Sequence, residues 1–435
     1  MKKAVKIFLI TLALTLGIGA AATYSLWKDI VIKDNGDNGA TDSLTDTAEA
    51  ENSLVQIEAI PSPTPTPYEE YDITIMAVGD NLLHKRIVSV GLKDDGSYDF
   101  HFLFEPIQEY LDKADISIIN QETIMAGNEK GLDGYPYFNS PVEVAQAISD
   151  AGFDVVLQAT NHTYDMGIDG MMNACEVWEQ YPSVTMIGMH KDAEDEHDIP
   201  IIEVKDKKIA ILNYTYAPNL GAVPSELKGH LNILCAIKEG SKTGEVDYTT
   251  LNPEVIEDIK KAKEMADFVI VCPHWGTEYM TQPSSYQVKF ADQMTEAGAD
   301  LILGTHPHVP EPVEWVESDN GNKSLCYYSL GNYVSTQQQG ESMLEEMAWV
   351  VLHVTEDDIY IDEDKTGVVP MVMHYKMNPM RYDNIYMLDD YTEELAAEHG
   401  IHSWGGVNLT LEKLEGYSDE IIRGWRLNSS YVLQQ

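Results

Sequence analysis

Short polar clusters recur along this chain, and each one follows a strongly apolar run. Carboxylate and amide oxygens mixed with imidazole nitrogens are ligands that suit Zn, Mn or Fe. A histidine placed among them can also deliver a proton near neutral pH. The residue types therefore predict a centre for a divalent metal (Zn, Mn or Fe), with one or two ions, that performs metal-assisted chemistry. The residues in these clusters are Asp80, Glu122, Asn161, His162, His274, His306 and His308.

Each of these residues is a weak signal by itself. Asp80 follows a glycine, and Gly-Asp is a common turn pair, while Glu122 could be an exposed loop acid. A lone histidine usually satisfies hydrogen bonds within the fold. The set is a stronger signal, because four histidines follow apolar runs. Two of them, His306 and His308, stand on either side of Pro307 and can reach one site from an extended loop.

Residues beside the clusters could bind the substrate of such a centre. Trp275, Glu278 and Tyr279 flank a cluster histidine and could line its cleft, although ordinary loop packing is the alternative. Arg86 belongs to a rare basic pair that could meet an anionic group or could simply lie on the surface. The candidate substrate-binding residues are His84, Arg86, Trp275, Glu278, Tyr279 and Asn332.

The elements that must position these clusters are strands alternating with helices. Apolar runs precede the clusters, and amphipathic segments with an early proline or a final glycine predict helices between them. This alternation indicates an α/β fold with mixed sheets. Ligands collect at the carboxyl ends of strands in such folds, so clusters from separate strands should meet. The predicted strands are 73–78, 116–119, 155–157, 208–214, 268–271, 301–303 and 325–328, and the predicted helices are 141–151, 169–180, 253–265 and 286–297.

The ends of the chain predict segments outside this fold. Residues 1–27 combine early lysines with an apolar stretch, which predicts a signal peptide or N-terminal membrane anchor. The protein is therefore expected to be extracytoplasmic, either membrane-anchored or secreted. Residues 28–70 are acidic and end in alternating prolines, which predicts a disordered linker. The other expected divisions are a folded domain over 71–380, with core motifs over 71–337 and an antiparallel addition over 345–375, and a C-terminal tail over 381–435.

Composition excludes several classes of function. The chain has 28 Lys and Arg against 72 Asp and Glu, a formal charge of −44, so its surface should repel nucleic acid. Sequence patterns of P-loops, dinucleotide-binding loops, serine-hydrolase elbows and His-Glu-x-x-His zinc helices are absent.

The four cysteines form no Cys-x-x-Cys pair. One disulfide is an open alternative, but Cys272 and Cys326 lie in apolar runs and favour buried small hydrophobes.

Six ordered motifs can be read along the chain. They are Val78-Gly79-Asp80, Asn120-x-Glu122, Asn161-His162-x-x-Asp165-x-Gly167, His274-Trp275-Gly276-x-Glu278-Tyr279, Gly304-x-His306-Pro307-His308-Val309 and Ser329-Leu330-Gly331-Asn332-Tyr333. In this order they resemble the motifs of the CapA family (PGA_cap domain), the bacterial capsule or poly-γ-glutamate synthesis proteins. The resemblance covers about residues 71–337.

The CapA family is similar to the calcineurin-like metallophosphoesterases. This similarity implies a four-layer αββα sandwich with metal ions at one sheet edge, and it implies that His162 is a proton donor. The sequence departs from the phosphoesterase pattern where Leu82 replaces an expected histidine and Glu122 replaces an expected bridging aspartate. A two-ion centre would then need His84 as a substitute. The metal ligands implied by the resemblance are Asp80, Glu122, Asn161, His274, His306 and His308.

The resemblance implies a protein of capsule biosynthesis that acts on a poly-γ-glutamate-like polymer. Its site would be a metal-dependent hydrolase or transferase acting on an amide or a phosphate ester. One alternative is a non-catalytic partner that binds the polymer or helps a membrane synthase export it. Another is an extracellular metallophosphoesterase. The expected partners are an anionic polymer or small anionic ester, a membrane synthase complex, and the membrane through the N-terminal segment, with no nucleic acid.

Overall fold

The computed structural model describes residues 68–195 and 197–434. The predicted signal or anchor segment, 1–27, lies outside the described residues, as does the predicted linker except for its last residues, 68–70. Within the described part of the chain, no helix is both long and apolar enough to cross a membrane.

The first sheet has nine strands and is mixed. Its central strand, β1 (Tyr71–Asn81), pairs in parallel with β2 (Ile116–Asn120) and with the short β13 (Asn332–Val334). The parallel half continues through β3 and β4, whereas β14 to β17 add an antiparallel half on the other side of β1. These outer strands are β3 (Val155–Leu157), β4 (Thr185–Ile187), β14 (Leu344–Val354), β15 (Ile359–Ile361), β16 (Gly367–Lys376) and β17 (Arg381–Met387).

The second sheet has six strands, in the order β11-β12-β10-β9-β6-β5. Its four inner strands are parallel, so their carboxyl ends share one edge. A separate two-stranded hairpin joins β7 (Cys235–Ile237) to β8 (Val246–Leu251). The strands of the second sheet are β5 (Ile201–Val204), β6 (Lys207–Thr215), β9 (Phe268–His274), β10 (Leu301–Leu303), β11 (Pro310–Glu317) and β12 (Lys323–Leu330).

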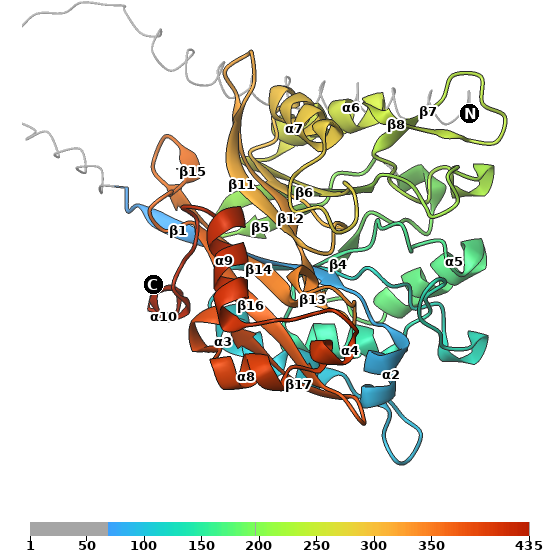
Figure 1. Ribbon diagram of the computed structural model, residues 1–435. Helices are drawn as coiled ribbons and strands as arrows, with labels where there is room; N and C mark the ends of the chain where they lie inside the picture. The colour runs from blue at the N-terminus through green and yellow to red at the C-terminus, as the bar shows by residue number, and fades with distance from the viewer. Residues whose placement is uncertain (1–67, 196, 435) are drawn as a thin grey trace, which may run out of the picture. The chain divides into compact units, whose positions relative to one another are not determined.

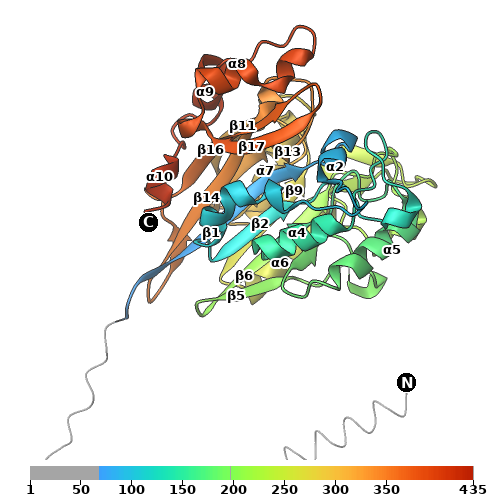
Figure 2. The same cartoon turned by 90° about the horizontal axis from the view of Figure 1, so that it is seen from below.

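The two sheets pack face to face, and helices cover their outer faces (Figures 1 and 2). Three hydrophobic clusters correspond to the three interfaces of this sandwich. On β9, Val269 and Val271 face the helices, while Ile270 and Cys272 face the other sheet. A strand buried on both faces needs apolar residues at nearly every position, which is why these strands read as continuous apolar runs. The arrangement confirms the predicted four-layer αββα sandwich of mixed sheets.

The helices that cover the sheets begin and end at recognisable signals. In α7 (Ser285–Ala297), Ser284 and Gln287 form a capping box, and Gly298 ends the helix with φ of 117°. Helix α6 (Pro253–Met265) has its proline at the first position. Both helices pack on the second sheet. The other helices are α2 (Lys85–Gly91), α3 (Gln108–Leu111), α4 (Glu143–Ala151), α5 (Gly167–Trp178), α8 (Glu393–Glu398), α9 (Leu411–Ile421) and α10 (Ser429–Val432).

The segment 381–435, expected to be a tail, is instead part of the fold as far as residue 434. Strand β17 pairs with β16, and α9 contacts both β11 and β14. Apolar residues of this segment, such as Ile385, Leu414 and Val432, are buried in the same core as β1. The tail prediction was wrong because each element here is short. Its few apolar positions carry little periodic signal until the first sheet covers them.

All four cysteines are unpaired and buried. Cys272 lies between the sheets, and Cys326 lies on the helix-covered face of β12. They act as small core hydrophobes, and the alternative of a disulfide is not realised.

Two buried histidines, His374 on β16 and His399 after α8, predict acid sensitivity. Burial lowers the pKa of His399 to about 3 and that of His374 to about 4. Both folded-state pKa values lie below the ordinary value of 6.5. The neutral, buried histidines therefore contribute stability that is present above pH 6.5 and is lost as pH falls below it. We expect His399→Asn to reduce the loss of unfolding free energy between pH 6 and pH 4.5 by up to about 1.4 kcal/mol per pH unit. Urea unfolding at several pH values measures this slope, and equal slopes in parent and variant would contradict the expectation.

Candidate metal centre

The carboxyl ends of five parallel strands from both sheets, with the loops that follow them, converge at one edge of the sandwich. Asp80 and His274 lie at the ends of β1 and β9, and the other residues follow β2, β3 and β10, as expected for ligand sites in α/β folds. The loop after β10 is joined to the end of β9 by a bridge between His274 and Thr305. This convergence brings together the seven residues predicted to form a centre, which are Asp80, Glu122, Asn161, His162, His274, His306 and His308.

Glu122 lies in the middle of this cluster and is completely buried. Its Oε1 is 3.9 Å from Nε2 of His162 and 3.8 Å from Nε2 of His274, and its Oε2 is 3.7 Å from Nδ1 of His308. Neither oxygen has a hydrogen-bond partner. Burial raises the pKa of this carboxyl well above its ordinary value. A buried carboxylate without donors is expensive unless a cation neutralises it.

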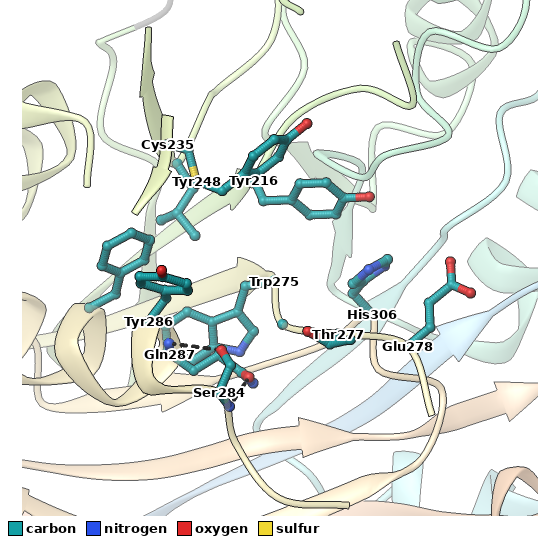
Figure 3. A pocket seen from close by; sticks show the side chains of 13 residues that line it. Tyr216, Cys235, Tyr248, Trp275, Thr277, Glu278, Ser284, Tyr286, Gln287 and His306 are labelled. Carbon is teal, nitrogen blue, oxygen red and sulfur yellow. Dashed lines mark hydrogen bonds between the residues drawn. The ribbon is translucent and has the colours of Figure 1, made fainter. Parts of the chain in front are cut away.

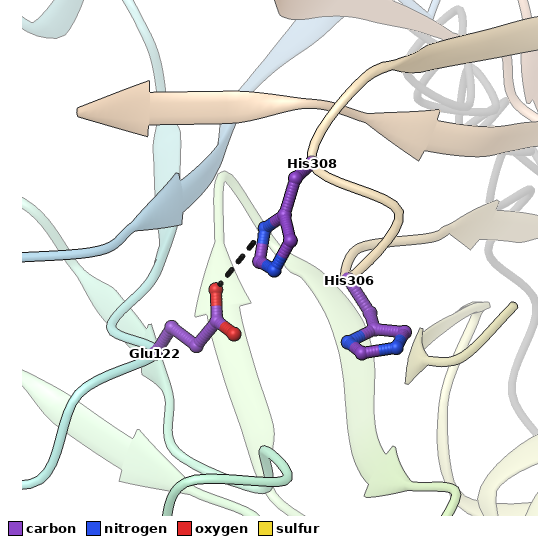
Figure 4. Close-up of side chains that lie close together, drawn as sticks. All are labelled: Glu122, His306 and His308. Carbon is purple, nitrogen blue, oxygen red and sulfur yellow. Dashed lines mark ion pairs between the residues drawn. The ribbon is translucent and has the colours of Figure 1, made fainter. Parts of the chain in front are cut away.

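Three of the residues offer ligand atoms to a single ion. Atoms of Glu122, His306 and His308 all lie within 4.8 Å of one another (Figure 4). Nδ1 of His306 is buried and has no hydrogen-bond partner, and burial lowers the pKa of this histidine, which favours the neutral form that binds metals. Two carboxylate oxygens and one imidazole nitrogen are thus left without partners at one point, and this donor set fits a divalent metal.

Asp80 stands beside these three residues. Its Oδ2 is 3.0 Å from Nδ1 of His308, and its carboxylate accepts hydrogen bonds from Asn120 Nδ2 and from the backbone N–H of His306. Burial lowers the pKa of His308, but the negative charges of Glu122 and Asp80 outweigh burial and raise it to about 9. The cluster therefore attracts positive charge to the place where His308 faces the two carboxylates.

His274 and Asn161 approach the other oxygen of Glu122. Nε2 of His274 is 2.8 Å from Oδ1 of Asn161, and its Nδ1 is 2.9 Å from Oγ1 of Thr305. The threonine hydroxyl fixes the ring, because the nitrogen of a metal-binding histidine that does not face the ion is commonly held by a hydrogen-bond partner. Burial lowers the pKa of His274 well below its ordinary value, so the ring is neutral. The two oxygens of Glu122 therefore face two groups of ligands, an arrangement that suits one or two ions.

His162 forms a dyad with Asp165. Its Nδ1 is 2.7 Å from Oδ2 of Asp165, which also accepts a hydrogen bond from the backbone N–H of Phe138. A carboxylate only accepts, so Nδ1 carries the proton and Nε2 is directed toward Glu122. The ring of Phe138 meets the imidazole edge-on at 4.6 Å between ring centroids. Nε2 also lies 3.5 Å from Nδ2 of Asn219 and faces the centre, where it can accept or deliver a proton.

The backbone explains why glycine precedes Asp80. A Cβ at Gly79 would lie 2.0 Å from the carbonyl oxygen of Gly331, and this close approach lets β13 pair with the end of β1. Asp80 is thereby paired with Asn332, whose Nδ2 donates to the backbone oxygen of His308 at 3.0 Å. Asn332, a predicted substrate-binding residue, therefore also holds the loop that carries His308.

The loop that carries His306 and His308 has an unusual backbone. Their φ angles are 100° and 61°, values that side-chain-bearing residues seldom adopt. Such conformations cost about 1–3 kcal/mol each and persist where surrounding contacts fix them, commonly at functional sites. Here Asp80 and Asn332 hold the loop.

The other predicted substrate-binding residues differ in position. The guanidinium of Arg86 lies 4.7 Å above the ring of Trp404, and Nδ1 of His84 accepts a hydrogen bond from the backbone of Thr336. These contacts give neither residue a place among the ligand atoms around Glu122. His84 nevertheless lies close to the cluster. Phe138 contacts both His84 and His162, and the pKa of His84 is lowered first by burial and next by the charge of His308.

Residues near His274 lie closer to the centre. The ring of Tyr279 is 6.1 Å from that of His308, and Glu278 lines a pocket together with His306 (Figure 3). Trp275 is almost fully buried and donates its indole N–H to the backbone oxygen of Tyr328, but its ring also lines this pocket.

Sequence reasoning left three polar residues of the site without a role. Asp165 was visible in the third motif, and Thr305 is the residue before His306. Asn219 has no local signal. Its Oδ1 accepts from Nδ2 of Asn161 at 3.1 Å, and its Nδ2 lies 3.4 Å from His162 Nδ1, although the residue is far away in the sequence.

Comparisons with known proteins agree with this geometry. The profile of the family described as "Bacterial capsule synthesis protein PGA_cap" matches residues 74–337. The chain is 28% identical over 313 residues to the capsule biosynthesis protein CapA of Bacillus anthracis, covering 70% of this chain and 68% of that protein. It is 28% identical over 289 residues to the PGA biosynthesis protein CapA of Bacillus subtilis (strain 168), covering 66% and 69%. A probable polyglutamine synthesis accessory protein of Mycobacterium tuberculosis is 23% identical over 204 residues, covering 46% and 51%.

Proposed function

Because the chain belongs to the PGA_cap family of bacterial capsule synthesis proteins, we propose that it acts in building a capsule polymer of the poly-γ-glutamate type. Two of its relatives are named for capsule biosynthesis and PGA biosynthesis. In this proposal the centre at Glu122 is a metal-dependent hydrolase or transferase site. Its substrate is an anionic polymer or a small anionic ester.

The observation that carries this proposal is the state of Glu122. Its carboxylate is fully buried, both oxygens lack partners, and three histidine nitrogens lie 3.7–3.9 Å away. Glu345 and Glu346 on β14 are equally buried and also lack partners, so burial alone does not mark a metal site. Glu122 differs because histidine nitrogens surround it, and a binding site for one or two divalent cations accounts for that grouping of ligand atoms.

In this proposal one group of residues holds the ion, and His162 transfers a proton. A bound divalent ion would polarise an amide or ester and activate a water molecule. His162 is oriented by Asp165, so its Nε2 can hold a proton at the centre and deliver it to the leaving atom. Asn219, close to both Asn161 and His162, holds the two side chains in register. The residues that would hold the ion are Asp80, Glu122, Asn161, His274, His306 and His308.

The proposed setting is the extracytoplasmic side of a membrane. The lysines and apolar stretch of residues 1–27 support export or anchoring, and the Pro-rich end of the acidic segment supports a spacer. A membrane synthase complex is the proposed partner, because nothing in this chain resembles a site for nucleotide-driven polymerisation.

Metal analysis of the purified full chain tests the proposal. We expect about one to two equivalents of Zn, Mn or Fe in the parent, and a large loss in both Asp80→Ala and His306→Ala. Asp80 lies on β1 of the first sheet and His306 follows β10 of the second, so a shared loss would show that both sheets build one centre. The measurement is elemental analysis by mass spectrometry after dialysis.

A parent that stays metal-free after reloading with Zn or Mn would contradict a catalytic metal centre. It would instead favour a non-catalytic partner that binds or exports the polymer. Metal that is retained in both variants would place the ion elsewhere in the chain. Rapid hydrolysis of an aryl phosphate with no activity on poly-γ-glutamate would favour the phosphoesterase alternative.

A further inference from the structure

An aromatic pocket of about 460 Å³ opens beside the metal centre (Figure 3). His306 lines it at one end, and the ring of Tyr216 stands 4.8 Å from that of His306. The pocket therefore begins where the centre ends, and a group that reaches His306 can extend into it. Its other apolar walls come from Leu234, Tyr248, Trp275, Tyr286 and Phe290.

The polar groups at the floor of the pocket are already paired. Ser284 and Gln287 bond each other in the capping box of α7, and Gln287 donates its side-chain amide to Glu311. The indole N–H of Trp275 is used by Tyr328. A guest in this pocket therefore meets mainly ring faces and aliphatic carbon, and its own polar groups would lose water without replacement.

The charge of the pocket lining also disfavours a charged guest. The pocket has no lysine or arginine among its described lining residues, and its charged lining residue is Glu278, at the His306 end (Figure 3). A glutamate side chain placed here would face a carboxylate and lose its hydration. The lining thus disfavours the repeating unit of a polyglutamate at this position.

We propose that this pocket binds an uncharged aromatic or branched aliphatic group of the substrate, next to the bond that lies at the metal centre. The inference rests on the proposed function, because it assigns a substrate to the same site. It goes beyond a plain polyglutamate: the substrate carries an apolar group on one side of the reacting bond. Such a group gains affinity by leaving water and packing against the tyrosine and tryptophan rings.

Binding of matched small probes to the full chain tests the inference. The probes are γ-glutamyl-benzylamide, γ-glutamyl-glutamate and γ-glutamyl-(2-aminoethyl)amide, which differ only in the group that would enter the pocket. Calorimetric titration in EDTA gives Kd values without turnover. We expect the benzylamide to bind about 10- to 100-fold more tightly than either charged probe.

Two tyrosine variants locate the site of binding. Tyr248→Ala removes a pocket wall and should weaken benzylamide binding about tenfold without changing the binding of the charged probes. Tyr360→Ala is the matched control, because Tyr360 is also a partly exposed strand tyrosine, 48% against 43%, but lies on β15 away from this pocket. It should bind all three probes as the parent does.

The outcomes separate this inference from the proposed function. Equal affinities for the three probes, tighter binding of a charged probe, or insensitivity to Tyr248→Ala would overturn the pocket assignment. A chain that binds the benzylamide as expected, yet holds no metal and hydrolyses nothing, would support the pocket and reject only the hydrolase or transferase proposal.

Discussion

Glu122→Gln is expected to abolish the stabilisation that divalent metal gives to this chain while leaving the metal-free chain at least as stable as the parent. In the metal-free chain the carboxylate is buried without donors, and the substitution removes a charge that costs free energy. In the parent, metal at 100 times its Kd adds about 2.7 kcal/mol, which raises Tm by roughly 3 °C in a domain of this size. Calorimetric unfolding with EDTA and with added Zn or Mn measures both effects.

The matched control for this substitution is Glu345→Gln. Glu345 on β14 is also fully buried with two unpartnered carboxylate oxygens, and burial raises its pKa well above the ordinary value. It is not among the residues clustered around Glu122. It should therefore keep the metal-dependent rise in Tm. A Glu122→Gln protein that still gains the full rise would contradict the assignment of this carboxylate to the centre.

His162→Ala is expected to lower the turnover rate about 10²- to 10⁴-fold while leaving the metal content unchanged. The proton held at Nε2 of His162 is needed only when the bond breaks, and general acid catalysis typically contributes this factor. The side chain lies 3.9 Å from Glu122, close enough to act at the centre, and is oriented by Asp165. Rates on poly-γ-glutamate and on p-nitrophenyl phosphate, together with metal analysis, test the expectation.

A second histidine–aspartate pair provides the control. His101 lies 2.6 Å from Asp99, nearly the distance in the His162 dyad, but it is part-exposed and also pairs with Asp150 on the surface. His101→Ala should therefore keep the parental rate. Loss of metal together with activity in His162→Ala would instead make this residue a ligand. An active parent whose His162→Ala variant keeps its rate would remove the proton-transfer role.

The two predictions separate the ion from the proton. Glu122 acts through charge that is already buried before any substrate arrives, whereas His162 acts during the reaction. A protein that fulfils the first and fails the second would be a metal-binding scaffold, which fits the alternative of a non-catalytic partner. Both the metal-dependent rise in Tm and the turnover rate must be measured, because loss of activity alone does not distinguish the role of Glu122 from that of His162.

Local patterns in the sequence were sufficient for the layers and for most of the centre. Strands such as β3 and β10 and helices such as α6 were predicted at or near their bounds, because apolar runs, first-turn prolines and capping residues are short-range signals. Polar clusters after parallel strands must share a sheet edge, so the meeting of Asp80 with His306 and His308 followed from strand order. The family resemblance, read from the same clusters, is confirmed.

Contacts between distant parts of the chain could not be read in this way. Arg86 was a candidate for the site, yet it lies on Trp404 because the C-terminal segment packs back onto the first sheet. The sequence predicts only a tail for that segment, because its elements are short and weakly periodic. Asn219 reaches Asn161 and His162 only through the packing of the two sheets.

The sequence by itself determined the chemistry available to this protein: which donors exist, which strand ends carry them, and therefore that a metal-binding edge is expected. The tertiary structure decided how those donors are used. It placed Glu122 without donors among three histidines and oriented His162 through its hydrogen bond to Asp165. It also placed the rings of Tyr216 and Tyr248 in the wall of a pocket that His306 lines. The physical reason is the separation along the chain over which each effect acts. Periodicity and capping act over a few residues, whereas burial, orientation and pocket shape depend on side chains brought together from both sheets.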